Sequence, residues 1–150
     1  ALDLDPRRIT ECRKINIPVF YGDARRKVML DKAGAERAVA VIVALDNTET
    51  IAHTVTNIRQ YWPALPVYAR ARDVKTTTEL VALGANLVVP DNVESSLQLG
   101  GQVLQDLGMP ADTLADLIAH IRDSDYTDFK KVVKSEGKVT PDEDPTESVA

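Results

Sequence analysis

Residues 38–45 read AVAVIVAL, an uninterrupted run of small and branched apolar side chains that ends at the polar pair Asp46 and Asn47. A strand that is apolar at every position must be covered on both faces, which is typical of a parallel sheet with helices on each side. Either Asp46 or Asn47 is suited to cap the helix that follows. Because ligands of open α/β sheets gather where strands end and helices begin, this stretch predicts the fold and the place of a binding site.

The same succession of strand, polar turn and helix continues on both sides of this stretch. Further strands are expected at residues 1–4, 19–21, 67–70 and 87–89, and helices at residues 6–15, 27–33, 47–61, 76–83, 93–107 and 111–121. Asp5 and Pro6 suit the start of the first helix, and Gly34 and Gly84 suit helix ends. The alternation predicts an α/β fold, a Rossmann-like doubly wound parallel sheet with right-handed crossovers.

The chain divides by composition into three parts. Residues 1–107 carry the alternation, residues 108–134 are expected to form a helical extension, and residues 135–150 are polar, acidic and proline-bearing. We expect this last part to be a disordered tail. The net charge of −5 argues against a general nucleic-acid binder, and no run of eighteen apolar residues is present that would span a membrane.

The glycine-rich turn of dinucleotide-binding folds is missing from the chain, because no Gly-x-Gly-x-x-Gly motif occurs. Asp3 nevertheless sits where such folds place an acidic residue after their second strand. We therefore expect the natural polypeptide to extend before Ala1 through a first strand and this turn. Without that central strand, the sheet would be split and would expose two apolar edges.

Five stretches of the sequence together resemble one known family. They are residues 19–24 (VFYGDA), 33–35 (AGA), 67–72 (VYARAR), 83–85 (LGA) and 95–100 (SSLQLG). In order and spacing they resemble the cytosolic nucleotide-binding regulatory domain of Kef-type potassium/proton antiporters, which is related to the TrkA and RCK domains of potassium transporters and channels. The resemblance covers roughly residues 1–107.

This resemblance implies a regulatory domain and not an enzyme. Such domains bind NAD(H), AMP, ADP or ATP at the C-terminal edge of the sheet and form homodimers. They act on a membrane-embedded antiporter module, here expected in the same polypeptide, from the cytoplasmic face. The implied ligand-binding residues are Asp3, Leu4, Gly22, Asp23, Ala24, Leu45, Asp46 and Arg70.

Each of these polar residues also has an ordinary structural interpretation. Asp3 could accept hydrogen bonds from ribose hydroxyls and repel the 2′-phosphate of NADP, or it could be solvated. Asp23 could lie near the adenine or bond its own turn, and Asp46 could be a cap. Arg70, with Arg72 on the same side of an extended segment, could bind phosphate, pair with acids across a subunit interface, or be solvated. The family's glutathione-gated members have an arginine near the position of Pro90, so glutathione gating is not predicted.

The helix at residues 93–107 carries an apolar stripe and resembles the crossover helix that lies across the partner subunit in the family. With this resemblance, we expect the stripe to be the interface of a homodimer; it consists of Val93, Leu97, Gly100, Val103, Leu104 and Leu107. An apolar stripe is often ordinary core, but the pair Gly100 and Gly101 favours a close helix contact, since glycine costs roughly 1 kcal/mol inside a helix.

Two other functions are left open by the sequence. One is a fragment of an NAD-dependent oxidoreductase, although no catalytic grouping or metal-ligand cluster is visible and nothing after Leu107 is large enough for a substrate domain. The other is a nucleotide-sensing subunit of a potassium channel. For the chain alone, we predict weak nucleotide binding or none, because the phosphate-cradling turn is absent.

Overall fold

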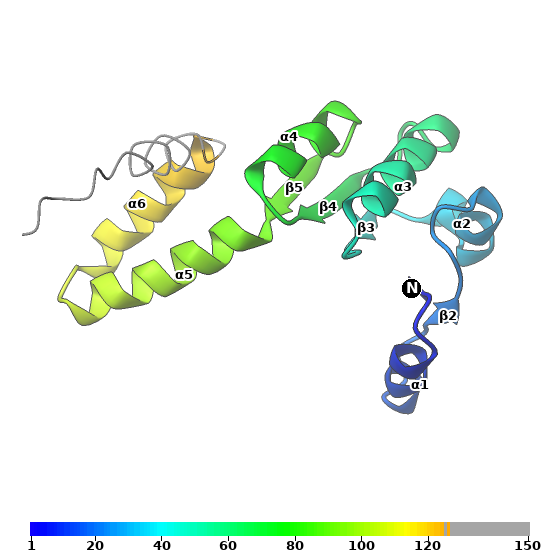
Figure 1. Cartoon of the computed structure of the whole chain (residues 1–150), viewed down its shortest axis with the longest axis horizontal. Coiled ribbons are helices and arrows are strands. Elements are labelled where there is room, and N and C mark those ends of the chain that lie inside the picture. The colour runs from blue at the N-terminus through cyan, green and yellow to red at the C-terminus, as the bar shows by residue number, and fades with distance from the viewer. Residues whose placement is uncertain (125, 127–150) are drawn as a thin grey trace, which may run out of the picture. The chain divides into compact units, whose positions relative to one another are not determined.

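The computed structural model describes residues 1–124 and 126, and Figure 1 shows its ribbon. The elements are β1 (Leu2–Asp3), α1 (Pro6–Lys14), β2 (Phe20–Tyr21), α2 (Lys27–Ala33), the short 3₁₀ helix η1 (Ala35–Arg37), β3 (Val41–Val43), α3 (Thr48–Tyr61), β4 (Val67–Ala71), α4 (Val74–Ala82), β5 (Leu87–Pro90), α5 (Asp91–Asp106) and α6 (Ala111–Asp123). Every predicted strand and helix in this part of the chain is present, with ends that move by a few residues. Most of residues 108–134 that are described form α6, and the predicted tail lies outside the described residues.

The chain forms two compact units, Ala1–Ser95 and Ser96–Ala150, whose boundary falls inside α5. The predicted division at residue 107 stays a prediction. The first unit contains the five strands seen in residues 1–124 and 126, together with helices α1 to α4, and it holds the residues expected to bind a ligand.

In the described residues, every strand pair is parallel, and the strands form two sheets. β1 pairs with β2, and β3, β4 and β5 form a second sheet in that order. The register sets Ile42 opposite Tyr68, and Tyr68 opposite Leu87. The sequence predicted parallel pairing and a split sheet with two exposed edges. In the described residues, β1 and β3 each have one side without a partner strand.

The core lies on one face of the β3–β4–β5 sheet, where α3 and α4 pack (Figure 1). Along β4, Val67, Ala69 and Ala71 are buried, while Tyr68 points to the opposite face and is 41% exposed. The expectation that residues 38–45 are covered on both faces is wrong, because Ile42 is 77% exposed and only Val43 of β3 is buried. An apolar run cannot show which of its faces receives a helix, and here the second face of β3 is open.

Helix ends follow the side-chain chemistry of their caps. Asp5 accepts a hydrogen bond from the backbone N–H of Arg7, and Asn47, rather than Asp46, caps α3 through the N–H of Thr50, both at 2.8 Å. Gly34 ends α2 in the left-handed region at φ +92°. The cap of α4 is Asp73, which the sequence interpretation missed because it started this helix at residue 76.

Arg59 of α3 ties together the turns that precede β4 and β5. Its Nε donates to the carbonyl oxygen of Gly84 at 2.5 Å, and its Nη1 donates to that of Leu65 at 2.6 Å. Its Nη2 donates to Oδ1 of Asn86, which also accepts the backbone N–H of Val67. This network fixes the N-terminal end of the sheet, opposite to the end where a ligand is expected.

In the second unit, α5 and α6 contact one another at Gly101. A Cβ atom on Gly101 would lie 3.4 Å from Cδ1 of Ile118, so the glycine permits the close contact. A Cβ atom on Gly100 would meet no atom within 4 Å. Within the described residues, Gly101 therefore packs against α6, whereas the space at the Cβ position of Gly100 is open.

Candidate functional site

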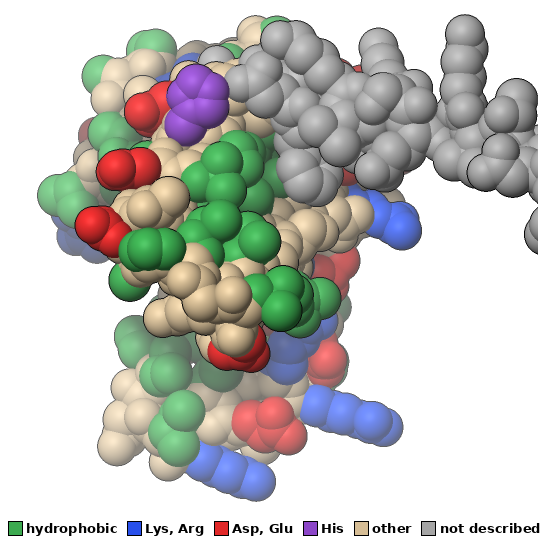
Figure 2. All heavy atoms as spheres, turned by 90° about the vertical axis from the view of Figure 1, so that its left-hand side faces the viewer, with side chains coloured by type: hydrophobic (Ala, Val, Ile, Leu, Met, Phe, Trp, Pro, Cys, Tyr) green, Lys and Arg blue, Asp and Glu red, His purple; other side chains and the backbone are tan. Residues whose placement is uncertain are grey.

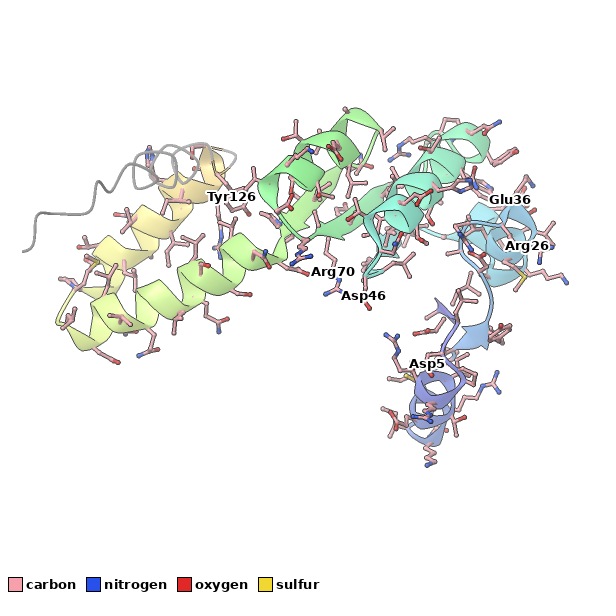
Figure 3. The ribbon with its side chains drawn as sticks, viewed as in Figure 1. Asp5, Arg26, Glu36, Asp46, Arg70 and Tyr126 are labelled. Carbon is pink, nitrogen blue, oxygen red and sulfur yellow. The ribbon has the colours of Figure 1, made fainter. Side chains whose placement is uncertain are left out.

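The C-terminal ends of β3, β4 and β5 bring charged side chains together at one edge of the sheet. Asp46 follows β3, Arg70 lies near the end of β4, and Asp91 is the first residue of α5, directly after β5. Because the strands are parallel, these ends meet at the same edge. Figure 3 shows the side chains of Asp46 and Arg70 close to each other there.

Arg70 joins two carboxylates. Its Nη1 donates to Oδ2 of Asp91 at 3.0 Å, and its Nη2 donates to Oδ1 of Asp46. Its Nε is buried and has no hydrogen-bond partner within the described residues. Asp46 is the more accessible partner, with a side chain 77% exposed against 42% for Asp91. Since Asn47 provides the helix cap, the carboxylate of Asp46 is available for this pair.

A pocket of about 200 Å³ opens beside this ion cluster. It is lined by Leu45, Asp46, Thr48, Ile51, Arg70, Ala71, Arg72, Asp91 and Asn92. Binding sites for whole ligands of drug size usually measure roughly 300–1,000 Å³, so this pocket suits one group of a larger ligand. Its guanidinium donors can bind a phosphate or carboxylate, and its aspartates can accept hydrogen bonds from hydroxyl groups.

Asp3, at the end of β1, has both carboxylate oxygens near donors. Oδ1 accepts the backbone N–H of Asp5 at 2.8 Å, and Oδ2 lies 3.6 Å from Nε of Arg8. The side chain is 28% exposed, so a ligand can still reach it. Leu4, the next residue, is 49% exposed. The backbone bond orients the carboxylate at the strand end, where ribose hydroxyls bind in dinucleotide-binding folds.

Asp23, in the turn after β2, is engaged by Arg25. The guanidinium of Arg25 donates from Nε to Oδ1 at 3.0 Å and from Nη2 to Oδ2 at 2.7 Å, and its backbone N–H also donates to Oδ1. These bonds hold the pKa of the Asp23 carboxyl below its ordinary value. The structural alternative, a carboxylate that fixes its own turn, therefore describes the contacts of Asp23.

The same turn is closely packed. The backbone N–H of Gly22 donates to the carbonyl oxygen of Asp3, which connects the ends of β1 and β2. A Cβ atom on Gly22 would lie 2.5 Å from Cε of Met29, and Ala24 packs against the main core. Nδ2 of Asn57, on α3, donates to the carbonyl oxygen of Arg25 at 2.6 Å.

The predicted residues thus lie at strand ends in two groups. Asp3, Leu4, Gly22, Asp23 and Ala24 are at the ends of β1 and β2, and Leu45, Asp46 and Arg70 are at the ends of β3 and β4. Sequence analysis missed Asp91, Thr48 and Asn92. A usable signal existed, because Asp91 follows its strand much as Asp46 follows β3. Arg72 lines the pocket but is exposed beyond the end of β4.

Comparison with known proteins adds the decisive observation, because the model of the TrkA-N domain matches residues 1–91. The chain belongs to the TrkA-N domain family. Its relatives include K(+) efflux antiporter 1, chloroplastic, of Arabidopsis thaliana, which is 34% identical over 91% of this chain and 12% of its own length. Another is the glutathione-regulated potassium-efflux system protein KefC of Salmonella arizonae, 38% identical over 80% of this chain and 20% of its own length. The chain therefore spans a fifth or less of these relatives.

Solved structures confirm the TrkA-N fold and bear on the ligand. The Shewanella denitrificans Kef C-terminal domain in its AMP-bound form is 28% identical and has a TM-score of 0.70, over 82% of this chain and 76% of that one. The GsuK channel bound to NAD is 25% identical, with a TM-score of 0.62, over 70% of this chain and 18% of that one. The resemblance to Kef-type regulatory domains is confirmed, and AMP and NAD, bound in these two structures, are among the nucleotides that the resemblance implied.

The described part of the chain has neither a membrane-spanning helix nor a metal-ligand cluster. None of its helices has the length and apolar character needed to cross a membrane. No group of three or more His, Cys, Asp and Glu side chains within residues 1–124 and 126 is arranged to hold a metal ion.

Proposed function

We propose that this TrkA-N domain binds an adenine nucleotide or NAD(H) and thereby gates potassium efflux by an attached potassium/proton antiporter, at the cytoplasmic face of the membrane. The observation that carries the proposal is the polar cluster at the strand ends, Asp3 in one group and Asp46 with Arg70 in the other. Support comes from the AMP-bound Kef domain of similar fold and from antiporter relatives.

In this proposal the two groups take different parts of the ligand. Asp3 accepts the ribose hydroxyls, because an ionised carboxylate is acceptor-only and can take two donors. Arg70 and the pocket beside it take a phosphate. Asp23 acts by fixing the turn through Arg25, so that Gly22 and Ala24 present a shaped backbone to the ligand.

The two sheets of the first unit support a further proposal, that an additional strand lies between them in the longer polypeptide. Within the described residues, β1 and β3 each have one side without a partner strand, and Ile42 of β3 is 77% exposed. A parallel strand supplied by a longer polypeptide would pair with both edges and join the two sheets into one, with the strand order of dinucleotide-binding folds. The glycine-rich turn that follows such a strand would bring backbone N–H groups to the phosphates.

Calorimetry on the longer polypeptide tests the ligand site. We expect AMP or NAD(H) to bind more tightly than NADP(H), and Asp3→Ala to weaken binding about tenfold or more, since hydrogen bonds to a charged group contribute roughly 1.5–3 kcal/mol. Asp31→Ala, which removes an exposed carboxylate from α2, is the matched control. Equal affinity in wild type and Asp3→Ala would remove Asp3 from the site.

We also propose a homodimer that uses the apolar stripe of α5. Val93 and Leu97 are buried, which leaves Gly100, Val103, Leu104 and Leu107 for a partner. Val103 is 50% exposed and Leu107 is 79% exposed. Figure 2 shows hydrophobic side chains gathered on the face that it views. Exposed apolar patches of this kind mark interaction sites.

Substitution of the two glycines separates the dimer contact from packing within the chain. Gly100→Leu should leave the fold intact, because nothing lies within 4 Å of its Cβ position, and should abolish dimerisation by steric overlap with the partner. Gly101→Leu should instead disturb the contact of α5 with α6. Light scattering measures the molar mass in solution, and a monomeric wild-type protein at micromolar concentrations would contradict the proposed dimer.

Transport measurements decide whether the domain is a gate. A ligand shifts a gate only by binding one of its states better, and a nearly complete shift needs roughly 5 kcal/mol of differential affinity. We expect potassium or proton flux through the full-length protein in vesicles to change with nucleotide on the cytosolic face, and Asp3→Ala to abolish that response. Flux indifferent to nucleotide, with turnover of NAD(H) by the isolated domain, would favour the oxidoreductase. Nucleotide-dependent flux that is channel-like and uncoupled from protons would favour the channel subunit.

A further inference from the structure

Arg70 is placed between the strand-end pocket and the first turn of α5. We infer that Arg70 is a positioning residue that couples an anionic group in this pocket to the start of α5, by sharing its guanidinium between Asp46 and Asp91. The inference rests on the proposed function, because it describes how a bound nucleotide phosphate would act on the helix that leaves the first unit.

The contacts place the two aspartates on different elements. Asp46 belongs to the turn between β3 and α3, and Asp91 begins α5. The bond from Nη1 of Arg70 to Asp91 measures 3.0 Å, whereas the backbone bond from Asn92 to the carbonyl oxygen of Arg72 measures 3.3 Å. The ion pair from β4 is therefore shorter than the backbone bond from Arg72, the residue that follows β4.

The guanidinium has limited capacity for a third anion. Its Nε is buried, so an anion arriving from solvent must share Nη1 and Nη2 with the aspartates already present. Asp46 and Asp91 are both partly accessible, and neither pair is sealed from solvent. An anion in the pocket thus competes with Asp91 for the guanidinium of Arg70 and weakens the bond between these two side chains.

The sign of the effect follows from this sharing. Neutralising Asp46 leaves the guanidinium to Asp91, so the first turn of α5 should be held more firmly. An anionic ligand draws the guanidinium toward the pocket, so the first turn should be held less firmly. α5 continues past Ser95 into the second unit. A change in how firmly its first turn is held therefore acts on a helix that both units share.

Hydrogen exchange of amides 92–97 tests the coupling in this chain without any nucleotide. We expect Arg70→Gln to speed their exchange about fivefold and Asp46→Asn to slow it about twofold. Asp46→Asn in the Arg70→Gln background should have no effect. Arg72→Gln is the matched control, because it removes the same charge from the same strand end without breaking the bridge. Exchange in β4 and α3, measured in the same samples, should change little.

Several results would overturn the inference. One is an Asp46→Asn effect that persists without Arg70. A second is an Arg72→Gln effect equal to that of Arg70→Gln. A third is a uniform change across α3, β4 and α5, which would indicate a general loss of stability.

Inorganic phosphate provides the ligand arm, with chloride at equal ionic strength as its control. Phosphate should speed exchange of amides 92–97 in wild type and leave the Arg70→Gln variant unchanged. If phosphate changes neither protein, the anion route is wrong. If nucleotide binds the longer polypeptide by calorimetry while its amides at the start of α5 do not respond, the coupling fails and the proposed function stands. If the mutational coupling is found but no nucleotide binds, the proposed function fails and the coupling stands.

Discussion

Arg59 and Arg70 lie at opposite ends of the same three-stranded sheet, and they are held by different kinds of partner. Arg59 donates to neutral acceptors, including the carbonyl oxygens of Gly84 and Leu65 and the side-chain amide of Asn86. These acceptors belong to turns that the arginine itself brings together. Because the carbonyl acceptors are parts of the backbone itself, a solute can take their place only if these turns unfold.

Arg70 is held by two carboxylates that are partly exposed to water. Under the proposed function, an anionic group of the ligand competes with Asp46 and Asp91, since a carboxylate and a phosphate both accept charge-assisted hydrogen bonds from a guanidinium. Arg59 and Arg70 therefore differ in the chemistry of their acceptors, and only those of Arg70 are charged. Burial alone does not separate them, because both side chains are half-buried.

The largest effect is expected at the N-terminal end of the sheet, where Arg59 holds the turns together. Arg59→Ala should lower the free energy of unfolding of the first unit by about 3 kcal/mol, because it leaves several acceptors without their charged donor. Arg70→Ala should cost less than about 1 kcal/mol, as is usual for accessible ion pairs. Trp62, the single tryptophan, packs against the core and reports unfolding of this unit by fluorescence in denaturant. Equal losses in the two variants would refute the distinction.

A smaller effect is expected at Gly84, the glycine against which Arg59 packs. Its φ of +101° disfavours any side chain, and a Cβ atom would lie 2.9 Å from Cγ and Cδ of Arg59. Gly34 has a similar φ of +92°, but its Cβ position has only an ordinary contact, 3.6 Å from Nη2 of Arg37. We expect Gly84→Ala to cost about 2 kcal/mol and Gly34→Ala about 1 kcal/mol, the share due to the backbone. Denaturant unfolding measures both, and identical costs would mean that Arg59 moves aside freely.

The smallest effect concerns Asp73, three residues after Arg70 in the sequence, whose carboxylate caps α4. The hydrogen bond from the backbone N–H of Thr76 is the main cause that holds the pKa of the Asp73 carboxyl below its ordinary value of 3.8. A carboxyl whose pKa is lowered in the folded state stabilises the protein above its ordinary pKa, and this stabilisation is lost as pH falls through the folded-state pKa.

Asp73→Asn keeps an acceptor for the cap but does not titrate. Near neutral pH it should lower the free energy of unfolding by roughly 0.5 kcal/mol, through loss of a charge at a helix N-terminus. The difference from wild type should shrink as pH falls below 3.8. Acid titration of stability measures this, with Asp73→Ser as a second uncharged cap. A gap that grows toward acid pH would reverse the sign and exclude this explanation.

Sequence reasoning was successful where a short local rule decides the structure. Asp5, Asn47 and Gly34 act at helix ends as their chemistry predicts, and alternation of strands with helices gave the parallel fold. It was wrong about Ile42, because an apolar run carries no information about which face a helix covers. It also started α4 late, since the cap at Asp73 precedes apolar and polar residues without a clear period.

The candidate site could be predicted by position but not by partner. Strand ends identified Asp46 and Arg70, whereas the ion pair of Arg70 with Asp91 joins residues 21 apart in the sequence and depends on strand register. Asp23 shows the reverse case. Its partner Arg25 is two residues away, yet only geometry shows that the guanidinium takes both oxygens.

The free edge of β3 also determines how this chain behaves at high concentration. Among the described residues, one side of this strand has no partner. Val39, just before the strand, and Ile42, within it, are 91% and 77% exposed. A short apolar strand with unpaired backbone groups is a template for adding further strands. The isolated chain is therefore expected to form large aggregates through β3 on standing, with rising thioflavin fluorescence. Ile42→Lys would suppress this growth, since a charge on an edge strand opposes stacking, and it would leave any association through α5 unchanged.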